Sequence, residues 1–220
     1  MVTVHYIGDS TVARNNIHSY PQTGMSQGLQ LYLKEAVRLV SYAKNGRSTK
    51  SFLDEGRFGP VEAAMMPGDF LLIQFGHNDE KDDPARHTDP QGSFQDNLRL
   101  FIRTAREKGA HPVLLTPIAR RLFDGRGNFL PGSHGAYPDA VKQVALAEDV
   151  PVIDLTAETE NYLAALGDEP SKPLFMWPKD NTHLKPEGAV KMAGLVAEGL
   201  RNLGGMYADL LAGTDEGAGI

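Results

Sequence analysis

The sequence predicts an α/β fold in which a parallel sheet carries helices on both faces. Five short apolar runs alternate with segments of helical periodicity along the 220 residues. Strands that alternate with helices are usually joined as βαβ units, which makes the sheet parallel and covers both of its faces. A chain of this length buries enough surface to fold without disulfides or a structural metal. We therefore expect residues 1–220 to form a single domain, with the last ~15 residues as a loosely ordered tail.

The predicted strands are short and end in turn or polar residues. The third, Asp69–Phe75, and the fourth, Pro112–Thr116, are nearly all apolar, which is typical of strands that are covered on both faces. The five predicted strands are Thr3–Gly8, Arg38–Ala43, Asp69–Phe75, Pro112–Thr116 and Pro151–Asp154.

Three segments between or after these strands have the apolar spacing of helices. In Phe94–Lys108, apolar residues recur at i, i+3, i+4 and i+7. Ala136–Ala147 and Pro186–Leu203 show a similar pattern, and Pro186 suits the first position of a helix.

Composition excludes several classes of function. The formal net charge of −6 argues against a nucleic-acid or anionic-membrane partner, because such partners favour a basic face. The chain has no cysteine, which excludes disulfides, thiolate zinc sites and cysteine nucleophiles. No signal-peptide pattern and no apolar run of transmembrane length occurs, so we expect a cytoplasmic protein, or a secreted one if a leader has been trimmed.

One G-x-S-x-G motif occurs at Gly24–Gly28, but its context is wrong for a nucleophile. This motif works when a strand feeds a strained turn that lifts the serine above a sheet. Residues 18–23 have no strand character, so we interpret Ser26 as the cap of a helix around Leu29–Leu33.

A better nucleophile follows the first predicted strand. Ser10 lies in the turn Gly8–Thr11, which we expect to cap a helix, at the carboxyl edge of the sheet where α/β proteins bind ligands. A serine attacks a carbonyl when a histidine takes its proton and a carboxylate orients that histidine. Asp180 and His183 lie three residues apart just before the last predicted helix, a spacing that lets the carboxylate reach the ring.

Donors for an oxyanion follow the first three strands. A glycine backbone N–H at Gly46, the side-chain amide of Asn78 and the N–H of Ser10 are the candidates. We interpret Asp79 as a structural carboxylate, because a carboxylate beside the oxyanion would repel it. We interpret Asp9 as a carboxylate that ties the turn through hydrogen bonds from backbone N–H groups. His77 receives no catalytic role.

Four blocks of the sequence then resemble the SGNH, or GDSL-type, hydrolase superfamily in the same order. They are GDST at 8–11, NGRS at 45–48, GHND at 76–79 and DNTH at 180–183. GDST departs from GDSL in its last residue, and the blocks look most like the rhamnogalacturonan acetylesterase family. Each block is weak alone, whereas four in order at strand ends are specific.

The resemblance implies a flavodoxin-like three-layer αβα sandwich with a central five-stranded parallel sheet. It also implies an esterase that removes O-acetyl groups from carbohydrate, such as acetylated rhamnogalacturonan oligosaccharides from pectin, through an acyl-enzyme on Ser10. It makes His183 the general base, Asp180 the orienting acid, and Ser10, Gly46 and Asn78 the oxyanion hole. No cofactor and no metal ion is expected, and the oligomeric state is left open.

Other functions remain open at this stage. The same residues would suit an esterase for another acetylated sugar, such as one of xylan type. Two candidates come from other classes. One is a metal-dependent phosphoesterase, and the other is a non-enzymatic module that binds carbohydrate or flavin. For the phosphoesterase, the hard ligands would be His77, Asp79, Asp82, Asp180 and His183. Aromatic residues in or near loops could stack on sugar rings, namely Tyr20, Tyr137, Phe175 and Trp177.

Overall fold

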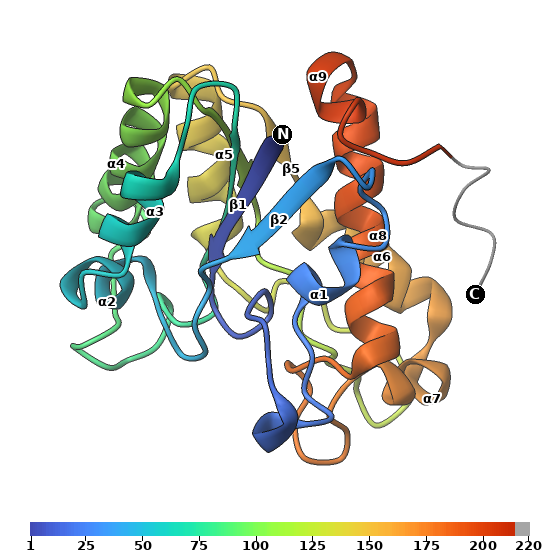
Figure 1. The fold of residues 1–220 in the computed structure, drawn as a ribbon. Coiled ribbons are helices and arrows are strands. Elements are labelled where there is room, and N and C mark those ends of the chain that lie inside the picture. The colour runs from blue at the N-terminus through green and yellow to red at the C-terminus, as the bar shows by residue number, and fades with distance from the viewer. Residues whose placement is uncertain (214–220) are drawn as a thin grey trace.

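A single five-stranded sheet forms the centre of the molecule (Figure 1). The computed structural model describes residues 1–213. All neighbouring strands are parallel, in the order β2-β1-β3-β4-β5. This confirms the predicted five-stranded parallel sheet. The strands are β1 (Val2–Gly8), β2 (Val37–Ser41), β3 (Phe70–Gln74), β4 (His111–Leu115) and β5 (Val152–Ile153).

Helices cover both faces of the sheet and complete the predicted αβα sandwich (Figure 1). One face is covered by α1 (Met25–Leu29), α6 (Leu155–Leu166) and α8 (Pro186–Leu203). The other face is covered by α2 (Thr49–Asp54), α3 (Phe58–Ala64), α4 (Ser93–Glu107) and α5 (Tyr137–Ala147). Shorter helical turns are η1 (Ile17–Ser19), α7 (Asp168–Ser171), η2 (Lys172–Leu174) and α9 (Gly205–Ala208).

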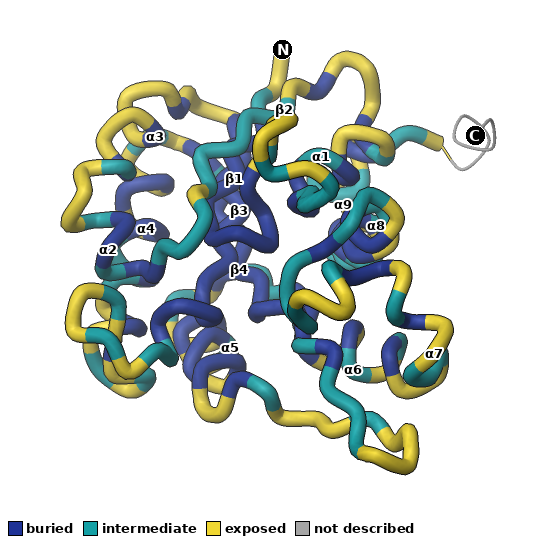
Figure 2. Tube along the Cα trace, turned by 90° about the horizontal axis from the view of Figure 1, so that it is seen from below, coloured by how far each residue is buried: buried dark blue, intermediate teal, exposed yellow. Residues whose placement is uncertain are grey.

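The core consists of two apolar layers, one on each side of the sheet. Along β3, Phe70 and Leu72 pack on the side of α8, whereas Leu71 and Ile73 pack on the side of α4. This alternation follows from the two-residue period of a strand. Viewed onto the carboxyl ends of the strands, the buried strands lie between the two helical layers (Figure 2).

The predicted tail and the predicted cap at Ser26 both need correction. Leu210 and Leu211 are buried, and Leu211 forms a β-bridge with Leu33, so this part of the expected tail packs against the core. The rest of the expected tail, at 214–220, lies outside the described residues. Ser26 lies inside α1 rather than capping a helix around 29–33, because the side-chain oxygen of Gln27 accepts the N–H of Gly24 and starts the helix there.

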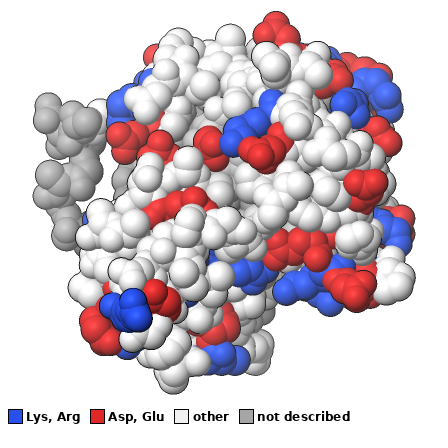
Figure 3. Space-filling model, turned by 180° about the vertical axis from the view of Figure 1, so that it is seen from behind, with Lys and Arg blue, Asp and Glu red and all other residues white. Residues whose placement is uncertain are grey.

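Charged residues of both signs are interleaved on the face shown in Figure 3. No broad basic field covers this face, in keeping with the net charge of −6. Within residues 1–213, none of the helices combines the length and the apolar character needed to cross a membrane.

Candidate active site

Ser10 follows β1 in a tight turn whose shape depends on the two residues before it. A Cβ on Gly8 would lie 2.6 Å from the carbonyl oxygen of Gln74 on β3, so only glycine lets the chain leave the sheet here. Asp9 then accepts hydrogen bonds from the backbone N–H and the hydroxyl of Thr11, both at 2.9 Å. This confirms Asp9 as a carboxylate that ties the turn. Contrary to the expectation from the sequence, the turn does not cap a helix, since the first helical residues are 17–19.

Asp180 and His183 lie in the loop that enters α8. The Oδ1 atom of Asp180 accepts the backbone N–H groups of Thr182 and His183 at 2.9 and 2.7 Å. Its Oδ2 atom lies 3.1 Å from Nδ1 of His183. Burial opposes ionisation of Asp180, but the hydrogen bonds from these two N–H groups and from the His183 ring outweigh it and lower its pKa. Asp180 is therefore an anion, and it accepts a hydrogen bond from the protonated Nδ1 atom of His183.

The other ring nitrogen of His183 faces Ser10. Nε2 of His183 lies 3.0 Å from Oγ of Ser10, across 173 residues of sequence. Because Nδ1 donates to the carboxylate, Nε2 is left as an acceptor for the serine hydroxyl. The three side chains thus form the hydrogen-bonded chain that a serine nucleophile requires.

Two backbone donors predicted for an oxyanion have no partner in residues 1–213. Neither the N–H of Ser10 nor the N–H of Gly46 finds a hydrogen-bond acceptor there. Gly46 has φ +78°, a left-handed conformation that glycine adopts without steric cost. Backbone N–H groups that are left unpaired are available for a developing negative charge.

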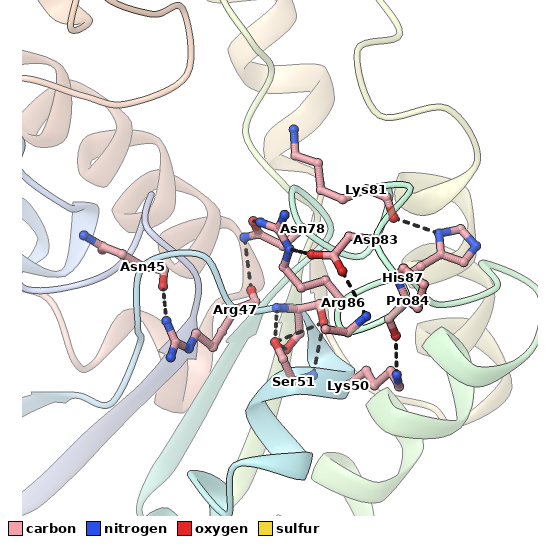
Figure 4. A network of polar contacts seen from close by, with 12 residues as sticks. Asn45, Arg47, Lys50, Ser51, Asn78, Lys81, Asp83, Pro84, Arg86 and His87 are labelled. Atoms are coloured by element: carbon pink, nitrogen blue, oxygen red, sulfur yellow. Dashed lines mark hydrogen bonds and ion pairs between the residues drawn. The ribbon is translucent and has the colours of Figure 1, made fainter.

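Asn78 is held in one orientation by two neighbours (Figure 4). Its Nδ2 atom donates to the carbonyl of Arg47 at 3.1 Å, and its Oδ1 atom lies 3.4 Å from Nη1 of Arg86. An amide nitrogen carries two protons, so one N–H of Asn78 remains for a ligand.

One pocket of about 100 Å³ brings most of these groups together. The predicted residues Ser10, Asn78, Asp180 and His183 line it. Gly46 does not line it, although the next residue along the chain binds Asn78. The remaining lining residues are His77, which received no catalytic role from the sequence, and Lys81, Arg120 and Thr182, which sequence reasoning missed as site residues.

Arg120 links two of the loops around the pocket. It follows β4, at the same sheet edge as the other site residues. Its Nη1 atom donates to the hydroxyl of Thr182 at 2.7 Å, and its Nη2 atom pairs with Glu80. The signal that could have found Arg120 is its place after the fourth strand, but one arginine in a loop forms no motif.

His77 lines the pocket and makes no hydrogen bond through either ring nitrogen. Its ring packs edge-on against His134, with 4.3 Å between the ring centroids. Burial first, and then the charges of His134 and Arg120, lower the pKa of His77 well below its usual value. His77 is accordingly a neutral wall of the pocket.

Asp79 is fully buried and serves the fold, as predicted. Its Oδ1 atom accepts hydrogen bonds from the N–H and hydroxyl of Thr49 and from the hydroxyl of Thr88. Burial raises the pKa of Asp79 to about 7 in spite of these hydrogen bonds.

The ligand set of the alternative metal site is not assembled in the part of the chain that the structure describes. No group of three or more His, Asp or Glu side chains in residues 1–213 is arranged to hold a metal ion. Asp79 is bound to threonines, and Asp180 and His183 bind each other.

The aromatic candidates for sugar stacking divide into two pairs. Phe175 and Tyr137 are buried at 0% and 6% exposure, so neither offers a ring face to a ligand, contrary to expectation. Tyr20 and Trp177 are exposed, and the cations of Arg121 and Lys172 lie over the Trp177 ring.

Comparison with known proteins identifies the family of the chain. Residues 6–190 match the model of the GDSL-like lipase/acylhydrolase family. The chain belongs to this family. It is 45% identical over 215 residues to the rhamnogalacturonan acetylesterase RhgT of Bacillus subtilis, and the match covers 92% of this chain and 91% of RhgT. The predicted relationship to the SGNH hydrolases and to rhamnogalacturonan acetylesterases is thereby confirmed.

Two solved structures share the fold of this chain. The YxiM protein of Bacillus subtilis superposes with a TM-score of 0.82 at 26% identity, over 92% of this chain and 56% of YxiM. The acetylxylan esterase Axe2 of Geobacillus stearothermophilus superposes with a TM-score of 0.66 at 19% identity, over 94% of this chain and 95% of Axe2. At that identity the likeness to Axe2 concerns the fold alone.

Proposed function

We propose that this chain is a serine esterase that removes acetyl groups from rhamnogalacturonan, with Ser10 as the nucleophile. The observation that carries the proposal is the hydrogen-bonded chain from Asp180 through His183 to Ser10, whose own N–H is unpaired. The 45% identity to RhgT, across nearly the whole of both chains, supports the substrate.

The first half of the reaction transfers the acetyl group to Ser10. Oγ of Ser10 bonds to the acetyl carbonyl carbon while its proton passes to Nε2 of His183. The carbonyl oxygen becomes an oxyanion, which accepts hydrogen bonds from the N–H groups of Ser10 and Gly46 and from Nδ2 of Asn78. The bond from the carbonyl carbon to the sugar oxygen then breaks, and His183 gives its proton to that oxygen.

The second half releases acetate. A water molecule loses a proton to His183 and attacks the acetyl carbon on Ser10. The same donors hold the second oxyanion, and the carbon–Oγ bond breaks as His183 returns the proton to Ser10. Asp180 keeps the His183 ring oriented and stabilises its cationic form in both halves.

Release of acetate from a panel of esters tests this proposal. The panel contains acetylated rhamnogalacturonan, acetylated xylan and p-nitrophenyl acetate, each with and without EDTA. We expect acetate from the first substrate at the highest kcat/KM and no effect of EDTA. A higher kcat/KM on acetylated xylan would mean that xylan, and not rhamnogalacturonan, is the substrate. Loss of all activity in EDTA would favour the metal-dependent alternative.

A further inference from the structure

Lys81 is a cation on the wall of the catalytic pocket that the proposed reaction does not use. It lies in the loop after β3 and lines the same pocket as Ser10 and His183. Among residues 1–213 its ammonium group has no hydrogen-bond or ion-pair partner. Only its backbone carbonyl is engaged, by the ring of His87.

Neighbouring charges do not neutralise Lys81. Asp83 pairs with Arg86 at 2.7 Å, and in Figure 4 the side chain of Lys81 extends away from that pair. Glu80 is occupied by Arg120 and by His134. Lys81 therefore adds a positive charge without an ion-pair partner to the lining of the pocket that holds Ser10.

Asp180, the acidic residue that lines the pocket, already has hydrogen-bond partners of its own. Asp180 accepts two backbone N–H groups and the ring of His183, so it has little attraction left for Lys81. Arg120 adds a second positive charge to the wall, although Glu80 compensates it. Positive charges around the pocket, including Arg120 and Lys81, contribute to the lowered pKa of His77 after the larger effect of burial.

We infer that Lys81 binds a carboxylate of the substrate and selects acetylated sugar chains that contain uronic acid over neutral ones. This inference rests on the proposed function and deepens it. A galacturonan carries a carboxylate on its uronic acid residues, whereas an acetylated xylose unit has none. An ammonium–carboxylate hydrogen bond is charge-assisted, and it favours the charged ligand most where the cation has no competing partner.

The effect belongs to binding rather than to the chemical step. The uronate carboxylate keeps its charge throughout acetyl transfer, so Lys81 holds it equally in the ground state and in the transition state. Loss of such an interaction raises KM and leaves kcat nearly constant. We expect Lys81→Gln to raise KM for the charged substrate by about tenfold, the size of one exposed charge-assisted hydrogen bond.

The test compares acetylated rhamnogalacturonan oligosaccharides with the same oligosaccharides after methyl esterification of their carboxylates. The readout is the ratio of kcat/KM for the charged substrate to kcat/KM for the esterified one. We expect the wild type to prefer the charged form, Lys81→Gln to bring the ratio close to one, and Lys81→Glu to invert it. Lys179→Gln is the matched control, because Lys179 is exposed beside Asp180 but does not line the pocket.

The outcomes separate this inference from the proposed function. A wild type that releases no acetate from the charged substrate would refute the proposed function and this inference with it. A wild type that does release acetate, with the same ratio in Lys81→Gln, would overturn the role of Lys81 alone. An equal drop in Lys179→Gln would also overturn it, since the effect would then be one of general surface charge.

Discussion

At the scale of single residues, the site depends on carboxylates whose protonation the fold controls in opposite directions. Asp180 is half-buried, and three hydrogen bonds from N–H groups lower its pKa. Asp79 is fully buried, and burial raises its pKa to about 7. The first carboxylate is therefore kept charged beside His183, whereas the second holds a proton over much of the acidic range.

Asp180→Asn tests the orienting role at this scale. The amide oxygen can still accept the N–H groups of Thr182 and His183, so the loop and the thermal unfolding midpoint should change little. An amide N–H next to Nδ1 favours the wrong tautomer of His183 and removes the charge that stabilises its cation. We expect kcat to fall by about three to four orders of magnitude, less than on removal of Ser10. Full activity in steady-state assays would mean that another carboxylate orients His183.

Asp79→Asn tests the raised pKa through stability. In the unfolded chain this carboxyl titrates near its ordinary value of about 4. Between about pH 4 and pH 7 the folded state keeps a proton that the unfolded state has lost, so the contribution of Asp79 to the free energy of unfolding falls as pH rises. An asparagine retains an oxygen acceptor for the bonds from Thr49 and Thr88 and cannot titrate.

Urea unfolding at several pH values measures this difference. We expect the free energy of unfolding of Asp79→Asn, relative to that of the wild type, to increase as pH rises from about 4 to about 7. Asp82→Asn, which removes an exposed carboxyl in the same loop, is the control. Parallel pH profiles for Asp79→Asn and the wild type would show that the pKa is not raised.

At the scale of elements, the close contact between α1 and α8 holds the helix that follows the Asp180–His183 loop. A Cβ on Gly28 of α1 would lie 2.6 Å from the carbonyl oxygen of Ala189 and 2.9 Å from Cα of Val190, both backbone atoms of α8. Backbone cannot move aside as a flexible side chain can, so the two helices would have to separate.

Gly28→Ala is therefore expected to lower the free energy of unfolding by about 1–3 kcal/mol, measured in urea. Gly59→Ala is the matched control, because Gly59 is also helical, has φ outside the left-handed region and has open space around its Cβ direction. That change should be neutral or stabilising by up to about 1 kcal/mol. Equal effects of the two substitutions would mean that helix propensity, and not packing, decides stability at Gly28.

Helices and strands with a strong apolar pattern were predicted from the sequence, and those with a weak apolar pattern were missed. The apolar spacing of Phe94–Lys108 corresponds to α4, and the apolar runs correspond to all five strands within a few residues. Helix α6 was not predicted, because Thr156 and Thr159 take buried positions where an amphipathic helix has apolar residues. Those threonines bond to carbonyl groups nearby, which a sequence pattern does not reveal.

At the scale of the whole molecule, parallel strands bring distant residues to one edge. Ser10, Asn78 and His183 come from three widely separated segments, and each lies at or near the carboxyl edge of the sheet. Their types and their place after strands identified them in the sequence. Lys81 and Arg120 were missed, because a single charge in a loop shows its role only once its partners in space are known.

The central claim is that Ser10 is the nucleophile. It is tested most directly by acetate release from acetylated rhamnogalacturonan by Ser10→Ala, with Ser26→Ala as the matched control. Ser26 is equally well buried and carries the G-x-S-x-G motif, but it lies inside α1. We expect Ser10→Ala to lose about five or more orders of magnitude in kcat with an unchanged unfolding midpoint, and Ser26→Ala to retain activity near that of the wild type. Near-wild-type turnover by Ser10→Ala would contradict the claim.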